Sequence, residues 1–289
     1  MSENLAELRR RYAEDIGRLA GVGWRPIVEA FAAVPREDFA GPGPWKIFGG
    51  DLQPRLTPDA DPGPLYANVL ISLDEAKGLN NGQPQFWAWL FEQLKPAPGE
   101  RVIHVGAGAG YYTAILAEMV GSGGRVTGIE FEPDLARRAA ASLADRPNVE
   151  ILAGDAHALA KGAADIIVAS CGFDDVPLHW VRLLNDAGRM LIPLTAGSAL
   201  PGIGAGAMLL VTRRGEAHEA RFAGWTMIYH DMSGRSDAAT ERLAQALPPM
   251  EPGRPSAPPE VASLRIGTEP DETCWLAGEG WWMSTAPSP

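Results

Sequence analysis

Cysteine is scarce in this 289-residue sequence, and long apolar runs and an excess of positive charge are absent. Its two cysteines, Cys171 and Cys274, lie far apart with no histidine at ligand spacing, so the sequence predicts neither a disulfide framework nor a metal site and indicates a reducing, cytoplasmic setting. Because no run of about 18 apolar residues occurs, no membrane span is expected. The 25 Lys and Arg residues are scattered among 36 Asp and Glu residues, and the net charge of −11 argues against a nucleic-acid partner.

The first part of the chain is predicted to form helices and loops. Apolar residues make up 46% of the sequence, enough for a full core. Residues 1–20 carry apolar side chains at helical spacing between charged ones, which predicts an amphipathic helix rather than a secretion signal. Two more helices are predicted over WRPIVEAFAAV and over PQFWAWLFEQL, in which Pro84 suits the first turn. Residues 40–70 are rich in Gly, Pro and Asp and are expected to form loops.

Between Pro96 and Thr195, apolar strand-like runs alternate with helix-like segments. This alternation is typical of an α/β fold with a Rossmann-like, doubly wound, mostly parallel sheet and helices on both faces. The runs AMLLVTRR and AHEARFAGWTMIYH then predict an antiparallel pair. We therefore expect an N-terminal helical subdomain over residues 1–95, an α/β core over 96–230 and a β-rich C-terminal extension over 231–289.

The C-terminal extension combines a proline-rich stretch with a tryptophan-rich one. Residues 248–260, PPMEPGRPSAPPE, are typical of an extended linker. Beyond them, SLRI and CWLA predict a β-hairpin, and a second turn at GEG precedes WWMS. Trp275, Trp281 and Trp282 require burial. Either they dock at the edge of the core, or they pack with the helix PQFWAWLFEQL and wall a substrate pocket.

A glycine-rich turn follows the first strand of the alternating region. In RVIHVGAGAGYYTAI, Gly106, Gly108 and Gly110 have the spacing GxGxG, and Tyr111 stands where a dinucleotide fingerprint needs its third glycine. The turn holds neither lysine nor arginine, and no GK[ST] sequence follows, which argues against a di- or triphosphate ligand.

Acidic residues end the next two predicted strands. Glu130 closes RVTGIE, where a carboxylate can accept hydrogen bonds from both ribose hydroxyls, and Asp155 follows VEILAG, where it can accept one from an adenine amine. Ligands of open α/β sheets bind beyond the carboxyl ends of the strands, so we expect the turn and both acids to meet in one crevice. S-adenosylmethionine fits, since it carries adenosine without phosphate and its carboxylate can meet the helix N–H groups that begin near Gly110. The alternative is that both acids are solvated strand ends.

Several segments together resemble the protein-L-isoaspartate O-methyltransferase family in order and spacing. They are EAFAAVPREDF (29–39), VIHVGAGAGYYTAILAEMVG (102–121), VTGIEFEPDLARRA (126–139), VEILAGDAHAL (149–159), DIIVAS (165–170) and AGRMLIPL (187–194). The resemblance implies a class I methyltransferase fold with an added N-terminal helical subdomain, and S-adenosylmethionine as cofactor. It implies cofactor-binding positions at Gly106, Gly108, Gly110, Glu130 and Asp155. Neighbouring residues expected to contact the cofactor are His104, Ala107, Tyr111, Phe131 and Ala156.

The family pattern breaks ahead of the helix that precedes the core. Family members carry GxTISxP, with a serine beside the methyl acceptor, whereas this chain has GLNNGQP. Gly82 stands in place of the serine, so the hydroxyl that would orient an acceptor carboxylate is missing. The alternative to a binding loop is that Asn-Asn-Gly only forms a turn with positive φ. The residues expected to contact the acceptor are Asn80, Asn81, Gly82 and Gln83, with Ser170 and Cys171 at the end of the fourth strand.

A second departure is His104, where the family usually places a glutamate on the first strand. A carboxylate there could hold the ammonium group of the cofactor, and a neutral histidine could do so only as an acceptor. The alternative is a core histidine with a hydrogen-bond partner on a buried strand. After the fourth strand no [DNS]PP[YF] sequence occurs, so methylation of adenine amino groups is not expected.

These features predict in-line methyl transfer from S-adenosylmethionine to a carboxylate of a peptide or small acid. Because a carboxylate needs no general base, the protein has mainly to align the reactants and exclude water, and no catalytic residue is assigned. One alternative is a small-molecule methyltransferase with a non-carboxylate acceptor, for which His157, His179 and His230 are candidate bases. The other is a cofactor-binding protein without turnover.

Overall fold

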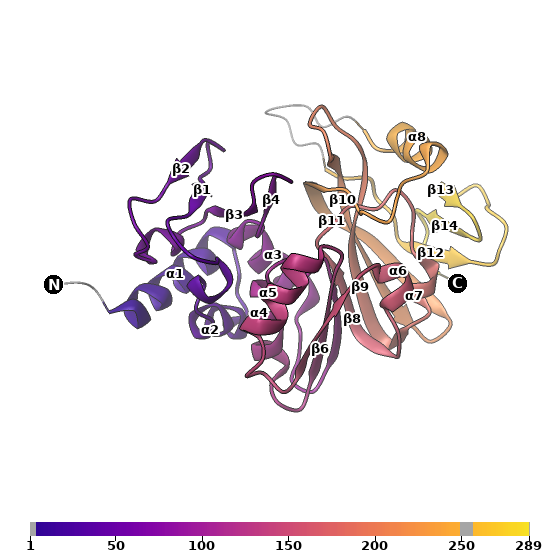
Figure 1. Cartoon of the computed structure of the whole chain (residues 1–289). Helices are drawn as coiled ribbons and strands as arrows, with labels where there is room; N and C mark the ends of the chain where they lie inside the picture. Colours follow the sequence, from indigo (N-terminus) through magenta and orange to yellow (C-terminus); the bar gives the residue numbers. More distant parts are fainter. Residues whose placement is uncertain (1–3, 249–256, 289) are drawn as a thin grey trace. The chain divides into compact units, whose positions relative to one another are not determined.

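The computed structural model describes residues 4–248 and 257–288 (Figure 1). They form two compact units, each made of two chain segments. One unit comprises Met1–Arg101 and Ala107–Gly154, and the other comprises Val102–Gly106 and Asp155–Pro289. The chain passes between the units three times, and one crossing, from Gly106 to Ala107, falls inside the glycine-rich turn, so this turn contributes residues to both.

The first unit begins with the predicted helices. The helices α1 (Leu5–Ala20), α2 (Arg25–Ala33) and α3 (Pro84–Leu94) confirm the three helix predictions of this region. The middle of the apolar stripe of α1 is buried where this helix packs against α2 and α3. Leu5 and Leu19, at the ends of the stripe, are 40% and 49% exposed, so the packed face is shorter than the sequence pattern.

A small antiparallel sheet follows α2, partly in the region predicted as loops. Its strands are β1 (Lys46–Phe48), β2 (Pro54–Leu56), β3 (Leu70–Asp74) and β4 (Leu79–Asn80), in the order β2-β1-β3-β4, with 3-10 helices at Glu37–Phe39 and Gly63–Leu65. The prediction of loops over residues 40–70 was therefore wrong in part. Strands of three residues are too short to show alternation, and the buried side chains of Trp45, Leu65 and Ile71 come together only in the folded chain.

The rest of the first unit is a parallel strand pair with its helices. The strands β6 (Arg125–Glu130) and β7 (Val149–Ala153) pair in parallel, and α4 (Tyr111–Val120) and α5 (Pro133–Ser142) pack against them. All of these elements fall on the segments predicted from the sequence.

The second unit continues the α/β pattern and then becomes antiparallel. The strands β5 (Arg101–Val105), β8 (Ala164–Ala169) and β9 (Leu184–Gly197) pair in parallel, with the short helices α6 (Ala156–Leu159) and α7 (Leu178–Val181) between β7 and β9 in the chain. The strands β10 (Ile203–Arg214) and β11 (Ala217–Tyr229) extend the sheet antiparallel to β9. The predicted antiparallel pair is confirmed.

The C-terminal strands pair differently from the prediction. The strands β12 (Ser263–Ile266), β13 (Cys274–Gly278) and β14 (Trp281–Ser284) form at SLRI, CWLA and WWMS, but β14 lies between the other two. The hairpin is therefore CWLAG with WWMS, not SLRI with CWLA, because the tight turn after Gly278 brings adjacent strands together first. β12 pairs with β11, which adds these strands to the sheet of the second unit.

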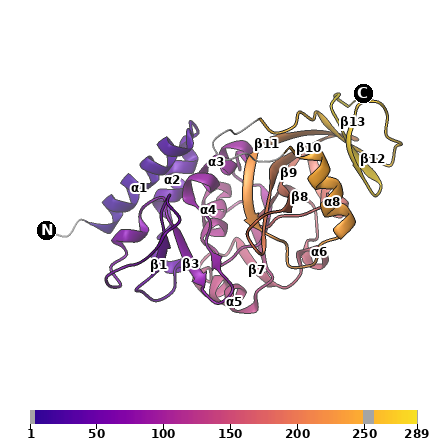
Figure 2. The same cartoon turned by 90° about the horizontal axis from the view of Figure 1, so that it is seen from above.

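A helix in the C-terminal extension was not predicted. α8 (Asp237–Ala246) begins at Ser236, whose hydroxyl accepts a hydrogen bond from the Ala239 N–H, and it packs on β9 (Figure 2). Ala239, Leu243 and Leu247 are the buried positions of this segment, and their spacing of four was the available signal. Most of the predicted proline-rich linker lies outside the described residues.

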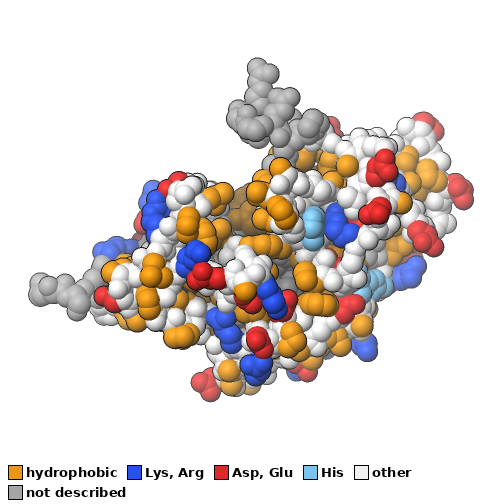
Figure 3. Space-filling view, turned by 45° about the horizontal axis from the view of Figure 1, so that its top comes forward, with side chains coloured by type: hydrophobic (Ala, Val, Ile, Leu, Met, Phe, Trp, Pro, Cys, Tyr) orange, Lys and Arg blue, Asp and Glu red, His pale blue; other side chains and the backbone are white. Residues whose placement is uncertain are grey.

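The surface charge is mixed. On the face drawn in Figure 3, Lys and Arg side chains lie among Asp and Glu side chains. Within residues 4–248 and 257–288, no helix combines the length and apolar character needed to cross a membrane.

Candidate functional site

The glycine-rich turn after β5 has a backbone that favours glycine. Gly106, Gly108 and Gly110 have φ values of 73°, 58° and 97°. A Cβ on Gly110 would lie 2.8 Å from Leu143 Cδ1 and 3.2 Å from Ala139 Cβ, so α5 packs directly against the start of α4. The N-terminal N–H groups of α4 therefore begin directly after the glycine-rich turn that follows β5.

Glu130, at the end of β6, is fixed against this turn. Its Oε2 accepts a hydrogen bond from the Gly108 N–H (2.6 Å), and its Oε1 accepts one from the Glu132 N–H (2.9 Å). The side chain is buried, and burial raises the pKa of its carboxyl although the two N–H groups act in the opposite direction. Each carboxylate oxygen keeps a lone pair for a further donor.

Asp155 is the N-cap of α6 in the second unit. Its Oδ1 accepts hydrogen bonds from the His157 N–H (2.8 Å) and from the Ser233 hydroxyl (2.7 Å). Burial alone would raise the pKa of Asp155, but these two hydrogen bonds, together with electrostatic interactions with His157 and His179, hold the pKa below its ordinary value. Asp155 is thus an ionised acceptor at neutral pH.

His104 is buried on β5 and has a partner on the neighbouring strand end. Its Nε2 lies 2.9 Å from Ser170 Oγ, directly after β8. Burial lowers the pKa of His104 to about 3, so the imidazole is neutral at physiological pH. This is the geometry of a core histidine with a hydrogen-bond partner, and Cys171, which follows Ser170, is half-buried.

The acceptor loop predicted at Asn80–Gln83 forms a tight turn. Asn80 Oδ1 accepts a hydrogen bond from the Gly82 N–H (2.9 Å), and Asn81 Oδ1 accepts one from the Ile71 N–H (2.8 Å). Gly82 has φ 75°, so the turn with positive φ is confirmed. Both asparagine carbonyl oxygens are used to hold the backbone.

Trp87 and Tyr112 occupy the space beside Gly82, which sequence reasoning missed. A Cβ on Gly82 would lie 2.6 Å from Trp87 Nε1. The Tyr112 hydroxyl donates to the Gly82 carbonyl (3.0 Å), and the Trp87 and Tyr112 rings stack with centroids 4.5 Å apart. Because the stack holds Trp87 in place, no serine side chain fits at position 82 without rearrangement.

The remaining predicted residues divide between the units. Tyr111 is buried, and its ring packs against Phe31 and Phe39, so its contribution to a ligand would come from its backbone N–H. Phe131 is 42% exposed, and Ala156 is buried. The first unit holds Asn80, Asn81, Gly82, Gln83, Ala107, Gly108, Gly110, Tyr111, Glu130 and Phe131, and the second holds His104, Gly106, Asp155, Ala156, Ser170 and Cys171.

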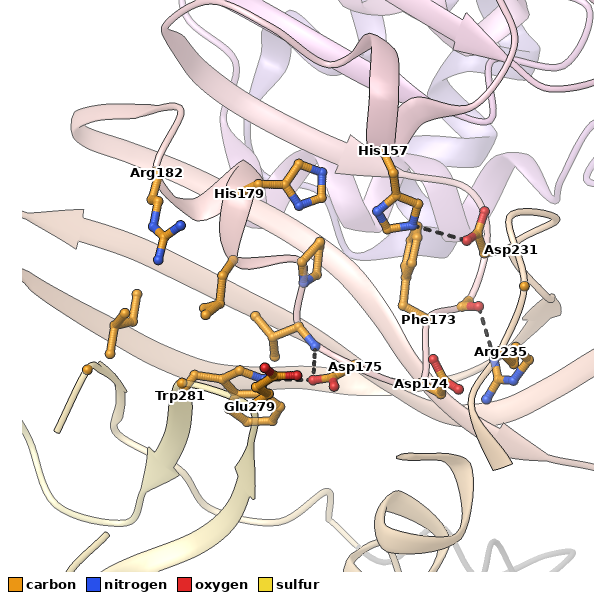
Figure 4. A pocket seen from close by; sticks show the side chains of 18 residues that line it. His157, Phe173, Asp174, Asp175, His179, Arg182, Asp231, Arg235, Glu279 and Trp281 are labelled. Carbon is orange, nitrogen blue, oxygen red and sulfur yellow. Dashed lines mark hydrogen bonds and ion pairs between the residues drawn. The ribbon is translucent and has the colours of Figure 1, made fainter. Parts of the chain in front are cut away.

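The second unit also contains a cavity of about 570 Å³ that the sequence did not indicate (Figure 4). It lies next to α6 and α7 and is lined by both acids and bases, among them His157, Asp231 and Arg235. His157 Nε2 lies 3.3 Å from Asp231 Oδ2, and this hydrogen bond raises the pKa of His157. Among the described residues, no three His, Cys, Asp or Glu side chains are grouped to hold a metal ion.

The family model and the curated relatives point to the same family. The family model for protein-L-isoaspartate(D-aspartate) O-methyltransferase matches residues 64–200. The protein-L-isoaspartate O-methyltransferase of Methanopyrus kandleri is 32% identical over 203 residues, which cover 67% of this chain and 81% of that protein.

Two solved structures share the architecture. A protein-L-isoaspartate O-methyltransferase matches with a TM-score of 0.63 and 21% identity, covering 82% of this chain and 69% of that chain. A structure from Plasmodium falciparum described as such an enzyme, in complex with S-adenosyl-L-homocysteine, matches with a TM-score of 0.55 and 16% identity, covering 77% and 95%. These likenesses confirm the predicted α/β methyltransferase fold.

Proposed function

Since the chain belongs to the protein-L-isoaspartate(D-aspartate) O-methyltransferase family, we propose that it methylates a carboxylate oxygen of a peptide or small acid. It is an enzyme that uses S-adenosylmethionine as methyl donor. Family membership does not favour the two alternatives, a methyltransferase with a non-carboxylate acceptor and a cofactor-binding protein without turnover.

We assign the cofactor contacts to the glycine-rich turn and the strand-end acids. Glu130 would accept hydrogen bonds from the ribose hydroxyls, Asp155 would accept one from the adenine amine, and the N–H groups that begin α4 would meet the carboxylate of the methionine part. The observation that carries this assignment is the fixed Glu130 carboxylate, 2.6 Å from the Gly108 N–H of the turn. Residues assigned to flank the ligand are His104, Gly106, Ala107, Gly110, Tyr111, Phe131 and Ala156.

Methyl transfer to a carboxylate requires little acid–base catalysis from this chain. Bound S-adenosylmethionine would supply a methyl group on a sulfonium, already activated for displacement. A carboxylate is ionised at neutral pH, so no residue has to remove a proton from it. His157, His179 and His230 are therefore not required as bases, and the work left to the protein is alignment and the exclusion of water.

The acceptor side departs from the family pattern, and we propose that isoaspartyl peptides are poor substrates. Gly82 has no hydroxyl, and the carbonyl oxygens of Asn80 and Asn81 already accept bonds from backbone N–H groups. An acceptor carboxylate would instead be met by other donors. We assign these contacts to the amide groups of Asn80, Asn81 and Gln83, the backbone of Gly82, and Ser170 and Cys171.

Two measurements test the function. Calorimetric titration with S-adenosylhomocysteine should show saturable binding at one site. After incubation with S-adenosylmethionine and a panel of peptides and small carboxylic acids, mass spectrometry should detect a methyl group that mild base releases as methanol, as expected for an ester. A base-stable methyl group, or binding without transfer to any acid in the panel, would overturn the proposal.

A further inference from the structure

The connection between β11 and α8, residues 230–236, lies beyond the residues that the family model matches. It is fixed against the loop that follows β8. The Asp231 N–H donates to the Gly172 carbonyl (3.0 Å), and the Ser236 N–H donates to Asp174 Oδ2 (2.7 Å). Between these points the Arg235 guanidinium also donates to the Gly172 carbonyl (3.1 Å). This connection is therefore held at both ends by hydrogen bonds.

Ser233, in the middle of this connection, reaches the acid that we assign to adenine. Its Oγ lies 2.7 Å from Asp155 Oδ1 and 3.3 Å from Asp231 Oδ1. A hydroxyl has one hydrogen to donate, and the shorter distance favours Asp155. The His157 N–H donates to the same Asp155 oxygen, so both bonds use Oδ1. The other oxygen, Oδ2, is the one left to accept a hydrogen bond from a ligand.

A second contact fastens the same connection to α6. Asp231 Oδ2 lies 3.3 Å from His157 Nε2, as the dashed line in Figure 4 shows. Asp155 and His157 are close in sequence on α6, and Ser233 and Asp231 are close on the connection, so the two contacts reinforce each other. The orientation of the Asp155 carboxylate thus depends on a segment outside the residues that the family model matches.

We propose that Ser233 is a positioning residue for the cofactor: by holding Asp155 Oδ1, it presents Oδ2 to the exocyclic amine of adenine. This inference rests on the proposed cofactor site and adds a residue to it. An ionised carboxylate in that position accepts from an amine and repels a carbonyl oxygen. Selectivity for adenine over hypoxanthine is therefore the property that Ser233 controls.

The test compares two ligands on matched variants of the full chain. S-adenosylhomocysteine carries the amine, and S-inosylhomocysteine carries a carbonyl oxygen in its place. Calorimetry should show that Ser233→Ala weakens S-adenosylhomocysteine binding about three- to tenfold and narrows the preference over S-inosylhomocysteine, whereas Ser233→Thr restores both. Ser198→Ala is the matched control, since the hydrogen bonds of this turn serine join it to Leu200 and Ile203.

Asp155→Asn separates this inference from the proposed function. If Asp155→Asn loses affinity and selectivity while Ser233→Ala matches the parent, the role of Ser233 is overturned and the cofactor site stands. If both variants bind both ligands as the parent does, the cofactor site itself is wrong and the inference falls with it. A loss in Ser233→Ala that is equal for both ligands would also contradict the positioning role.

Discussion

Two turns of this chain need glycine for similar steric reasons, but only one of them keeps the residues that the family resemblance implies. Gly110 and Gly82 both have positive φ, and at both a Cβ would lie under 3 Å from a neighbouring side chain, Leu143 at one and Trp87 at the other. The turn that ends at Gly110 keeps the residues that the family resemblance implies, whereas the turn at Gly82 lacks the expected serine. The difference teaches that glycine at position 82 fits the packing of Trp87 and Tyr112 around it, so restoring the serine alone would require these neighbours to move.

The comparison of the two turns would fail if a serine fitted at position 82. Gly82→Ser should lower the free energy of unfolding by about 1–3 kcal/mol more than Gly78→Ser does, because it adds overpacking against Trp87. Gly78 is the matched control, because it also has positive φ (68°). A Cβ at Gly78 would meet no described atom within 4 Å beyond its chain neighbours, so this position lacks the overpacking. Chemical denaturation of both variants gives the difference. Equal losses would show that Trp87 does not exclude the serine.

The next prediction tests the glycine-rich turn through Glu130, whose carboxylate accepts a hydrogen bond from the Gly108 N–H. Glu130→Ala should weaken S-adenosylhomocysteine binding by about 1.5–3 kcal/mol, because charge-assisted hydrogen bonds to the ribose are lost. Glu150→Ala serves as control, since Glu150 is an exposed β7 residue paired with Arg125. Calorimetry of the two variants decides the point, and equal affinities in both would remove Glu130 from the site.

A smaller effect on stability is expected from the hydrogen bond between Tyr112 of α4 and the turn at Asn80–Gln83. Tyr112→Phe should keep the stack on Trp87 but remove the hydroxyl that donates to the Gly82 carbonyl, which costs about 1 kcal/mol of stability. Urea denaturation measures the loss. Affinity for S-adenosylhomocysteine should stay at the parent value, and a variant as stable as the parent would mean that this hydrogen bond does not hold the turn.

The weakest expected effect is on the pH dependence of cofactor binding. Burial raises the pKa of Glu130 above its ordinary value of 4.5, and binding uses the ionised form, so affinity for S-adenosylhomocysteine should fall as the pH drops through this raised pKa. The free protein is not destabilised by that protonation, since a raised carboxyl pKa means that the fold favours the protonated form. Asp155, with its lowered pKa, stays ionised over the same range. In calorimetric titrations, Glu130→Gln should abolish this fall in affinity with falling pH. A fall that persists in the variant would assign the titration to another group.

Local patterns in the sequence predicted the long elements of the fold. The helix that begins at Pro84 and the strands ending at Val105 and Glu130 were predicted because each carries its own periodicity and end signals. The short strands β1 and β2 carry no such pattern. The order of β12, β13 and β14 was not predicted, because local periodicity marks where strands form but not which strands pair.

Candidate site residues could be proposed from the sequence where a single residue carries the chemistry. Glu130 and Asp155 stood out as acids at strand ends, and the turn at Asn80–Gly82 stood out as a departure from a pattern. The hydrogen bond of Ser233 with Asp155 was not predictable, because only the fold brings these two distant residues together. Trp87 is close to Gly82 in sequence, but its place beside Gly82 depends on its stack with Tyr112, which local patterns do not encode. The partners that orient a site are therefore the part that the structure adds.

The central claim is that this chain keeps the cofactor side of its family and differs on the acceptor side. The most direct test is methyl transfer from labelled S-adenosylmethionine to an isoaspartyl peptide, measured on a sample that binds S-adenosylhomocysteine by calorimetry. We expect binding of the cofactor product together with little or no methyl incorporation into the peptide. Turnover comparable to that of an authentic repair enzyme would contradict the claim and show that the turn at Gly82 orients the acceptor without the serine.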